Sequence, residues 1–368
     1  MRTTCVKDKI RRAVVFTERV TNKNSTLPIL SSIIITANKT NLIIKATNLE
    51  IGVEIKIQAK VEKEGEVAVP GGLINNTLSN ITTNEKIEIE SVNNNLVIST
   101  KNNSILIKSY PTDDFPIIPR IKKGDGGEFT IKASKLISGI HAVMYSAAIS
   151  DIKPEIASIY IYQEGKDLIF VATDSSRLAE KKIVNPTINQ ELEIILPLKT
   201  AQEVVRIFED TVGDVSISFN KNQITLQTED IYITSRLVNG IFPDYKQIIP
   251  KKTNTEAIIL KQDLLTTLKL AHVFSDKFNK VDLNIDPANK FFELISKNNN
   301  TGEYTTTIKS ALNGDSLRVS FNQKYLIDVL NSIKQDSVTL SFAGQNKPLI
   351  ITGVGDLSFR YLVMPMNS

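Results

Sequence analysis

The fold is decided by three segments that share one pattern: CVKDKIRRAVVFTERV at residues 5–20, ASKLISGIHAVMYSA at residues 133–147 and KQDLLTTLKLAHVFS at residues 261–275. Apolar residues recur in each segment at three- and four-residue intervals, which is typical of an amphipathic helix. When Ile10, Leu136 and Leu264 are aligned, the segments are offset by 126 and 128 residues. A period of this length predicts a chain built from repeated domains.

A second helical pattern has a similar period. It is found in VPGGLINNTLSNI from Val69, LPLKTAQEVVRIF from Leu196 and FNQKYLIDVLNSI from Phe321, whose starts lie 127 and 125 residues apart. The dipeptide Phe-Pro also recurs after 127 residues, at positions 115–116 and 242–243. These markers together predict three related domains, at residues 1–120, 128–250 and 255–368.

Between the helices the apolar residues alternate with polar ones, as in VEIKI at residues 53–57 and KIEIE at residues 86–90. Alternation of this kind indicates half-buried strands. Asn- and Gly-rich breaks, such as residues 93–95 and 164–167, are typical of hairpin turns because both residue types tolerate positive φ. Each domain is therefore predicted to be α+β, with two helices packed on antiparallel sheets.

The composition argues against catalysis and against a metal centre. The single cysteine, Cys5, excludes a disulfide framework and a multi-thiolate zinc site, and His141 and His272 are too few for a histidine-rich centre. We find no P-loop, HExxH or GxSxG motif, and carboxylates such as Asp174 stand in turns without a catalytic partner. We therefore assign no catalytic residue and expect no metal and no cofactor.

The N-terminal residues carry charges every few positions, unlike a secretory signal. No later window offers eighteen uncharged apolar residues, the length of a membrane-spanning helix. We therefore expect a cytoplasmic protein without a membrane partner.

Positive charge recurs on equivalent helices, although the net charge is only +4. In the first helix Lys9, Arg12 and Arg19 lie opposite Ile10 and Val14. Further basic residues on the later helices are Lys135, Lys199 and Arg206. Each of these basic residues, taken alone, is explained by a helix face that is exposed to solvent. Their recurrence favours a sequence-independent partner with regularly spaced negative charge, and duplex nucleic acid fits such a surface.

Four segments together resemble the signatures of one family. ATDSSRLA at residues 172–179 resembles the family's ATDGHRLA, and YLVMPM at residues 361–366 resembles its YxVMPM. FPDY at residues 242–245 and LPIL at residues 27–30 resemble family segments that have the same letters. The family is the bacterial sliding clamp, the β subunit of the replicative DNA polymerase III. The resemblance implies three DNA-clamp domains per chain and a head-to-tail homodimeric ring. It also implies that the helices line a hole around duplex DNA and that the protein is a non-catalytic processivity factor.

The family also has a hydrophobic pocket that binds short linear motifs of the polymerase, the clamp loader and repair proteins. The resemblance assigns its first part to Ile156, Thr173, Ser175, Arg177, Leu178, Pro243, Ile248, Leu362 and Met364. It assigns the second part to Lys153, Tyr325, Pro348, Val363, Pro365 and Met366. The alternative is that the final strand belongs to the core and accounts for about half of these side chains.

The resemblance also extends the candidate DNA surface and suggests a dimer contact. With the loop and turn positions added, the DNA-binding set is Lys9, Arg12, Arg19, Lys23, Asn24, Lys135, Ser150, Lys199 and Arg206. The dimer contact is expected between Ile105 and Ile107 of one chain and Val273 and Phe274 of the other.

Two of the positions at which this sequence departs from the family are doublets. Ser175-Ser176 stands where the family has Gly-His, so the rim of the pocket is expected to differ. Gly71-Gly72 stands where a basic pair is common, so the first domain is expected to contribute less to DNA contact.

Two other classes of function would make different demands on the sequence than a clamp does. A nucleic-acid enzyme would need a carboxylate cluster for two metal ions, and the spacing of Asp and Glu offers none. A non-catalytic β-repeat adaptor without DNA encirclement is the alternative that stays open. It would not require basic residues on equivalent helices.

Overall fold

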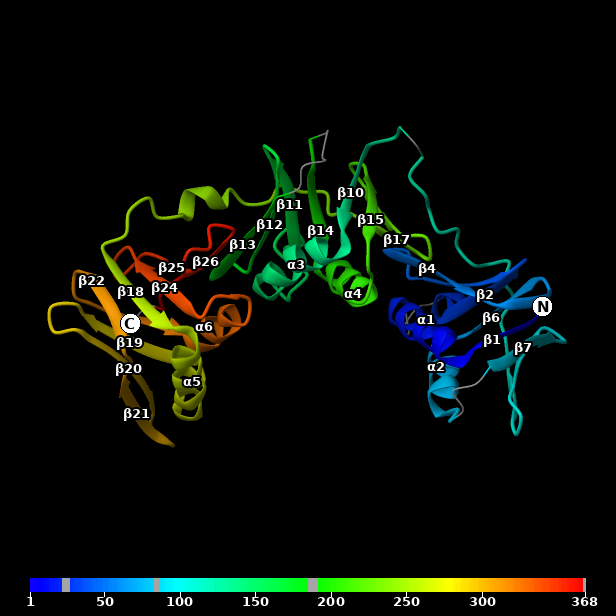
Figure 1. Ribbon diagram of the computed structural model, residues 1–368, viewed down its shortest axis with the longest axis horizontal. Coiled ribbons are helices and arrows are strands. Elements are labelled where there is room, and N and C mark those ends of the chain that lie inside the picture. The colour runs from blue at the N-terminus through cyan, green and yellow to red at the C-terminus, as the bar shows by residue number, and fades with distance from the viewer. Residues whose placement is uncertain (22–26, 83–85, 123, 185–190, 367–368) are drawn as a thin grey trace. The chain divides into compact units, whose positions relative to one another are not determined.

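A computed structural model describes residues 1–21, 27–82, 86–122, 124–184 and 191–366 (Figure 1). The described chain divides into two compact units. The N-terminal unit takes in Met1–Ser134 and Gln202–Leu237. The C-terminal unit takes in the described residues of Lys135–Pro186, Glu191–Ala201 and Val238–Ser368.

The N-terminal unit contains two antiparallel sheets. The five-stranded sheet has the order β5 (Lys60–Lys63), β1 (Arg2–Val6), β7 (Lys86–Val92), β8 (Asn95–Ser99), β9 (Ser104–Ile107). The eight-stranded sheet has the order β10 (Gly127–Lys132), β15 (Asp214–Phe219), β16 (Gln223–Gln227), β17 (Ile231–Arg236), β4 (Ile51–Gln58), β3 (Asn41–Thr47), β2 (Ser32–Asn38), β6 (Gly65–Pro70).

The C-terminal unit also contains two antiparallel sheets. The nine-stranded sheet has the order β14 (Glu193–Pro197), β11 (Ser158–Glu164), β12 (Asp167–Thr173), β13 (Arg177–Val184), β26 (Phe359–Val363), β25 (Leu349–Gly353), β24 (Ser337–Phe342), β18 (Thr255–Leu260), β22 (Ser310–Gly314). The four-stranded sheet has the order β21 (Gly302–Thr307), β20 (Phe291–Asn298), β19 (Lys280–Asp286), β23 (Leu317–Asn322).

The six predicted helices are all present in the described chain. They are α1 (Lys7–Val20), α2 (Gly71–Asn80), α3 (Ala133–Val143), α4 (Leu198–Phe208), α5 (Lys261–Ala271) and α6 (Gln323–Leu330). Short 3₁₀ turns are η1 (Pro28–Ser31), η2 (Met144–Ser146), η3 (Tyr245–Ile248) and η4 (His272–Phe274). Helices α1 and α2 lie side by side, as do α5 and α6 (Figure 1). The prediction of an α+β fold with repeated helix pairs on antiparallel sheets is confirmed.

The helices bury the faces that their apolar spacing predicts. The aligned residues Ile10, Leu136 and Leu264 are all buried, and α1 packs this face on β3 and β4. Full burial of one such side chain stabilises the fold by about 1.5–3 kcal/mol. The helical spacing of apolar residues therefore correctly predicts the buried face of the first helix in each of the three repeats.

Strands from different repeats join into common sheets. In the N-terminal unit β17 pairs with β4, with Ile233 opposite Val53. In the C-terminal unit β13 pairs with β26, with Leu178 opposite Leu362. Because backbone hydrogen bonds cross from one repeat to the next, the compact units follow these shared sheets and not the boundaries of the predicted domains.

The Asn- and Gly-rich breaks form the predicted hairpins. Asn93 and Asn94 join β7 to β8 with φ values of 47° and 63°, and Gly165 joins β11 to β12 with a φ of 63°. Two consecutive residues with positive φ are the geometry of a tight hairpin whose twist matches its strands. The turn chemistry therefore fixes the register of these strand pairs.

Candidate functional site

Strand β13 brings the two longest signature segments together inside the C-terminal unit. Leu178 lies opposite Thr173 of β12 on one side and opposite Leu362 of β26 on the other. Arg177 lies opposite Val363, and the backbone N–H of Met364 then donates to the carbonyl of Ser176 at 2.8 Å. Residues 173–178 and 362–364, which are far apart in sequence, therefore form one surface of the unit.

Part of the predicted pocket belongs to the core of the C-terminal unit. Leu178 and Leu362 are only 1% and 2% exposed, and they pack in one cluster with Phe242 and Tyr245. Val363, Thr173 and Pro348 are buried as well. The alternative that the last strand is a core strand thus holds for Leu362 and Val363. Leu178, Thr173 and Pro348 are core residues of other segments, and all five side chains can only line the floor of a pocket.

Other members of the predicted set are accessible. Met364 is 39% exposed, and Ile248 is 48% exposed. Pro243 is also exposed, while Pro365 and Met366 are half-buried. Exposed apolar side chains beside a buried apolar floor form a surface that a hydrophobic peptide side chain could cover.

The segment that carries Pro243 and Ile248 is held to the sheet by tyrosines. The ring of Phe242 stacks on Tyr160 with centroids 4.8 Å apart. The hydroxyl of Tyr245 donates to a carboxylate oxygen of Glu180 at 2.5 Å and lies 2.8 Å from the hydroxyl of Tyr162. Burial, together with the hydrogen bond to Glu180, raises the pKa of Tyr245 well above its ordinary value, so the phenol stays a donor. Sequence reasoning cited Tyr245 only as part of the signature and missed this role.

Arg177 is the centre of a charged network below the signature loop. Its guanidinium donates to Asp174 at 2.9 Å and to Asp328 of α6 at 2.7 Å. It also lies over the ring of Tyr325, 4.3 Å from the centroid. With a side chain only 10% exposed, the guanidinium is a fixed part of the site that joins β13 to α6. The sequence could not show Asp328 as a partner, because it lies 151 residues away.

The loop before Arg177 has an unusual backbone. Ser175 adopts a φ of 75°, a left-handed conformation that favours glycine. Its N–H donates to the hydroxyl of Thr173 at 3.1 Å, and Asp174 accepts from the N–H groups of Ser176 and Arg177, both at 3.0 Å. The family's glycine therefore matches the geometry of this position better than the serine found here.

Replacing Ser175 with glycine should stabilise the protein. The left-handed conformation costs a residue with a Cβ about 1–2 kcal/mol, whereas the added chain entropy of glycine costs about 0.5–1 kcal/mol. We expect Ser175→Gly to raise the free energy of unfolding by about 0.5–1 kcal/mol in urea denaturation. The matched change Gly165→Ser, at a φ of 63° with open space around the added Cβ, should lower it. A Ser175→Gly protein less stable than the parent would contradict this reading of the loop.

Lys153 and Ile156 lie in the turn before β11. Lys153 is exposed and its carbonyl accepts from the N–H of Ile156 at 3.2 Å. The carbonyl of Ile156 in turn accepts from the N–H of Ala148 at 2.9 Å. The turn is thus closed by backbone hydrogen bonds, and Ile156 is half-buried in it.

The candidate DNA-binding residues of the N-terminal unit lie on α1 and the second half of α4. Lys9, Arg12 and Arg19 are exposed. Arg12 pairs with Asp210 at 3.1 Å, while Arg19 and Arg206 both approach Glu203. Lys23 and Asn24 lie outside the described residues.

The remaining DNA candidates lie in the C-terminal unit. Lys199 pairs with Asp151 at 2.9 Å, and the Lys135 ammonium donates to the carbonyl of Val184 at 2.9 Å. Ser150 is exposed. An exposed ion pair contributes only about 0–1 kcal/mol, so a phosphate can replace the carboxylate at little cost. These neighbouring acids should nevertheless keep DNA affinity modest.

The candidate dimer residues divide between core and surface. On the edge strand β9, Ile107 is 2% exposed and Ile105 is half-buried on the same face, whereas Leu106 on the other face is 56% exposed. Val273 is 65% exposed, and Phe274 stacks on Tyr304 with centroids 6.1 Å apart. Sequence reasoning missed Leu106, because SILI is apolar at three consecutive positions and alternation alone does not select the face.

Within the described residues, no group of three or more His, Cys, Asp or Glu side chains is arranged to hold a metal ion. Among these same residues, no helix is both long enough and apolar enough to span a membrane.

Three family models of the DNA polymerase III beta subunit match consecutive parts of the chain. The N-terminal domain model matches residues 1–119, the central domain model residues 130–244 and the C-terminal domain model residues 246–367. The matches leave only short joins between them, at residues 120–129 and at residue 245.

Similar proteins of known name and structure are clamps. The chain is 23% identical over 374 residues to a beta sliding clamp of Synechococcus elongatus, covering 100% of this chain and 99% of that one. It is 26% identical over 372 residues to a beta sliding clamp of Staphylococcus epidermidis, covering 96% and 95%. The crystal structure of the DNA polymerase III beta subunit of Thermotoga maritima matches with a TM-score of 0.93, 25% identity and coverage of 100% and 99%. The chain therefore belongs to the DNA polymerase III beta subunit family, which includes the beta sliding clamps.

Proposed function

We propose that this protein is the processivity factor of a replicative DNA polymerase, a non-catalytic ring of two chains arranged head to tail that encircles duplex DNA. The observation that carries the proposal is the end-to-end match of three consecutive beta-subunit domain models. We take the functional domains to be residues 1–120, 128–250 and 255–368, one for each model. The adaptor alternative is not favoured, because it explains neither this match nor the basic residues on equivalent helices.

The helices hold DNA through its phosphates and by encirclement. The exposed cations Lys9, Arg12 and Arg19 can meet phosphates, and none of the assigned contacts needs a base edge. Because Asp210 and Glu203 compete for the same cations, each contact is weak and exchanges readily with salt. Weak, interchangeable phosphate contacts let a ring stay on DNA without fixing its position along it.

The pocket tethers the polymerase, the clamp loader and repair proteins through short linear motifs. A leucine or phenylalanine of the motif would pack on the floor made by Leu178 and Leu362, between Pro243, Ile248 and Met364. Methionine suits such a surface because its flexible, polarisable side chain adapts to different partners. The Arg177 network and the Tyr245–Glu180 hydrogen bond fix segments that carry this surface.

If two chains close into a ring, the protein should be a dimer, and Val273 should lie in the interface between the chains. Since a ring requires association of two chains, sedimentation should give about twice the chain mass of 40.9 kDa. Val273→Asp should yield monomers at low micromolar concentration, because it puts a charge into the proposed interface without touching a core. Ile107→Asp is a poor test, since Ile107 is buried and a charge there should unfold its sheet.

The matched control is Val354→Asp, an exposed valine in the turn after β25. It should remain a dimer with the same stability as the parent. A Val273→Asp protein that sediments as a dimer at low micromolar concentration would show that this helix end does not form the interface.

A further inference from the structure

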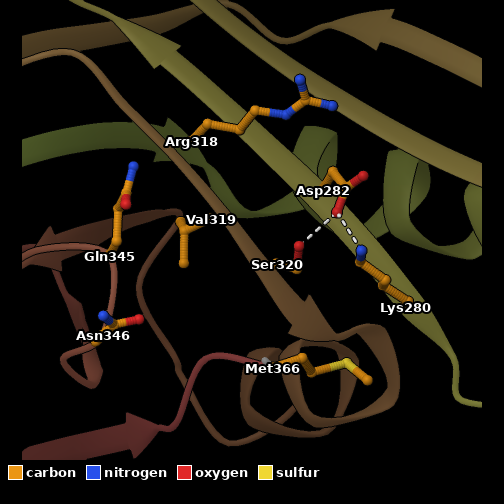
Figure 2. Close-up of a pocket in the computed structure, with 8 residues that line it drawn as sticks. All are labelled: Lys280, Asp282, Arg318, Val319, Ser320, Gln345, Asn346 and Met366. Carbon is orange, nitrogen blue, oxygen red and sulfur yellow. Dashed lines mark hydrogen bonds and ion pairs between the residues drawn. The ribbon is translucent and has the colours of Figure 1, made fainter. Parts of the chain in front are cut away.

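A polar cleft of about 340 Å³ opens on the four-stranded sheet of the C-terminal unit. Its walls include the basic side chains of Lys280 and Arg318 and the amides of Gln345 and Asn346 (Figure 2). Met366 of the terminal segment lines it as well (Figure 2). The cleft lies outside the set of residues assigned to the peptide pocket, apart from Met366.

The cleft has more positive than negative charge. The Lys280 ammonium lies 3.5 Å from a carboxylate oxygen of Asp282, which also accepts from the Ser320 hydroxyl at 2.5 Å. Arg318 forms no ion pair within the part of the chain that the structure describes. Two cations therefore face one carboxylate, and that carboxylate is already engaged by Lys280 and Ser320.

The strand register places the charged groups on one face. On β19 and β23, Asp282 lies opposite Ser320 and Asn284 lies opposite Arg318. Side chains two residues apart on a strand share a face, so Arg318 and Ser320 project together with Asp282. The guanidinium is exposed, and it has the planar set of donors that binds a carboxylate through two parallel hydrogen bonds.

The cleft is continuous with the second part of the proposed peptide pocket. The backbone N–H of Met366 donates to the carbonyl of Ser320 at 2.8 Å, which fixes the terminal segment beside β23. On the other wall, Asn346 is two residues before Pro348, another member of that part of the pocket. A peptide that passes over Met366 would extend a flanking residue into the cleft.

We propose that this cleft binds an acidic side chain, Asp or Glu, that flanks the apolar core of a partner peptide. Arg318 forms the principal ion pair, and Lys280, Gln345 and Asn346 supply further donors. The cleft thus selects among partners by the charge next to their apolar motif, while the apolar pocket supplies the shared affinity. The inference rests on the proposed peptide-binding function.

The test uses peptides with a leucine- and phenylalanine-containing core, acetylated and amidated so that only side chains carry charge. One peptide has two acidic flanking residues, and its isostere has the corresponding amides. Fluorescence anisotropy with the 368-residue protein should show about tenfold tighter binding of the acidic peptide, the gain of one bidentate, charge-assisted pair of hydrogen bonds between a carboxylate and the Arg318 guanidinium. High salt should remove most of this preference.

Variants then assign the preference to the cleft. Arg318→Gln should reduce the tenfold preference to less than about twofold and leave the affinity for the amide peptide unchanged, because it removes the charge and keeps a polar side chain. The matched control Lys166→Gln, in the exposed turn between β11 and β12, should bind both peptides like the parent.

Three outcomes would overturn the inference. If the parent binds the acidic and amide peptides equally, or if Arg318→Gln keeps the preference, the cleft does not recognise a carboxylate, although the pocket function stands. If the parent binds neither peptide, the pocket function itself fails and the inference fails with it.

Discussion

Deleting residues 364–368 should abolish binding of partner peptides while the chain stays folded and dimeric. Strand β26 ends at Val363, which is fully buried and lies opposite Arg177 on one side and Leu349 on the other. The deletion therefore leaves the strand whole. It removes both methionines and Pro365 from the proposed pocket, along with the backbone hydrogen bonds to Ser176 and Ser320.

The expected loss of affinity is large. Burial of an apolar side chain contributes about 1.5–3 kcal/mol, and each 1.4 kcal/mol is a factor of about ten in affinity. Removal of both methionines should weaken binding by at least about a hundredfold, measured by fluorescence anisotropy beside sedimentation.

A shorter deletion, of residues 367–368 only, is the matched control and should bind like the parent. Unchanged affinity after the longer deletion would place the pocket elsewhere. Loss of folding after the longer deletion would mean that the terminal segment is part of the core.

Much of the fold was predictable because it depends on short-range patterns. A helix that packs on a sheet must repeat its apolar residues every three or four positions, and this spacing located all six helices. The turns at Asn93-Asn94 and Gly165 were predictable for a similar reason, since few residue types accept positive φ.

The sharing of sheets between repeats was not predictable from these patterns. Pairing of β17 with β4 joins residues about 180 positions apart, and the alternation within each strand does not say which strand will be its neighbour. For the same reason the buried face of β9 could not be assigned. The sequence marked Ile105 and Ile107 as apolar, but it did not show that Leu106 is the exposed side chain.

The residues of the candidate site were predictable where they belong to a signature motif. The charged and hydrogen-bonded partners of these residues were not predictable, because the partners are distant in sequence. The resemblance grouped Arg177, Leu178, Leu362 and Met364 in one site. In the structure Arg177 and Leu178 lie on β13, Leu362 lies on the adjoining strand β26, and Met364 follows that strand. The pairing of Arg177 with Asp328, of Tyr245 with Glu180 and of Lys199 with Asp151 depends on long-range packing. The Lys199–Asp151 pair also bears on the proposed DNA contact, because a paired lysine attracts phosphate less than a free one.

If the protein encircles DNA, its retention should have an all-or-none dependence on DNA topology. The exposed helix cations have acidic neighbours such as Asp210 and Asp151, so contacts alone should hold a short linear duplex weakly and lose it steeply as salt rises. A closed ring, in contrast, cannot leave a closed circle without opening. Retention should therefore depend on DNA ends and not on sequence.

The most direct measurement assembles the protein on closed circular duplex with its clamp loader, isolates the complex by gel filtration and then linearises the DNA with a single-site nuclease. Encirclement predicts that the protein stays on the circle in moderate salt, leaves the linear DNA, and is retained again when bulky protein blocks are attached to both ends. Retention on linear DNA with free ends, or equal loss from circular and linear DNA, would contradict it.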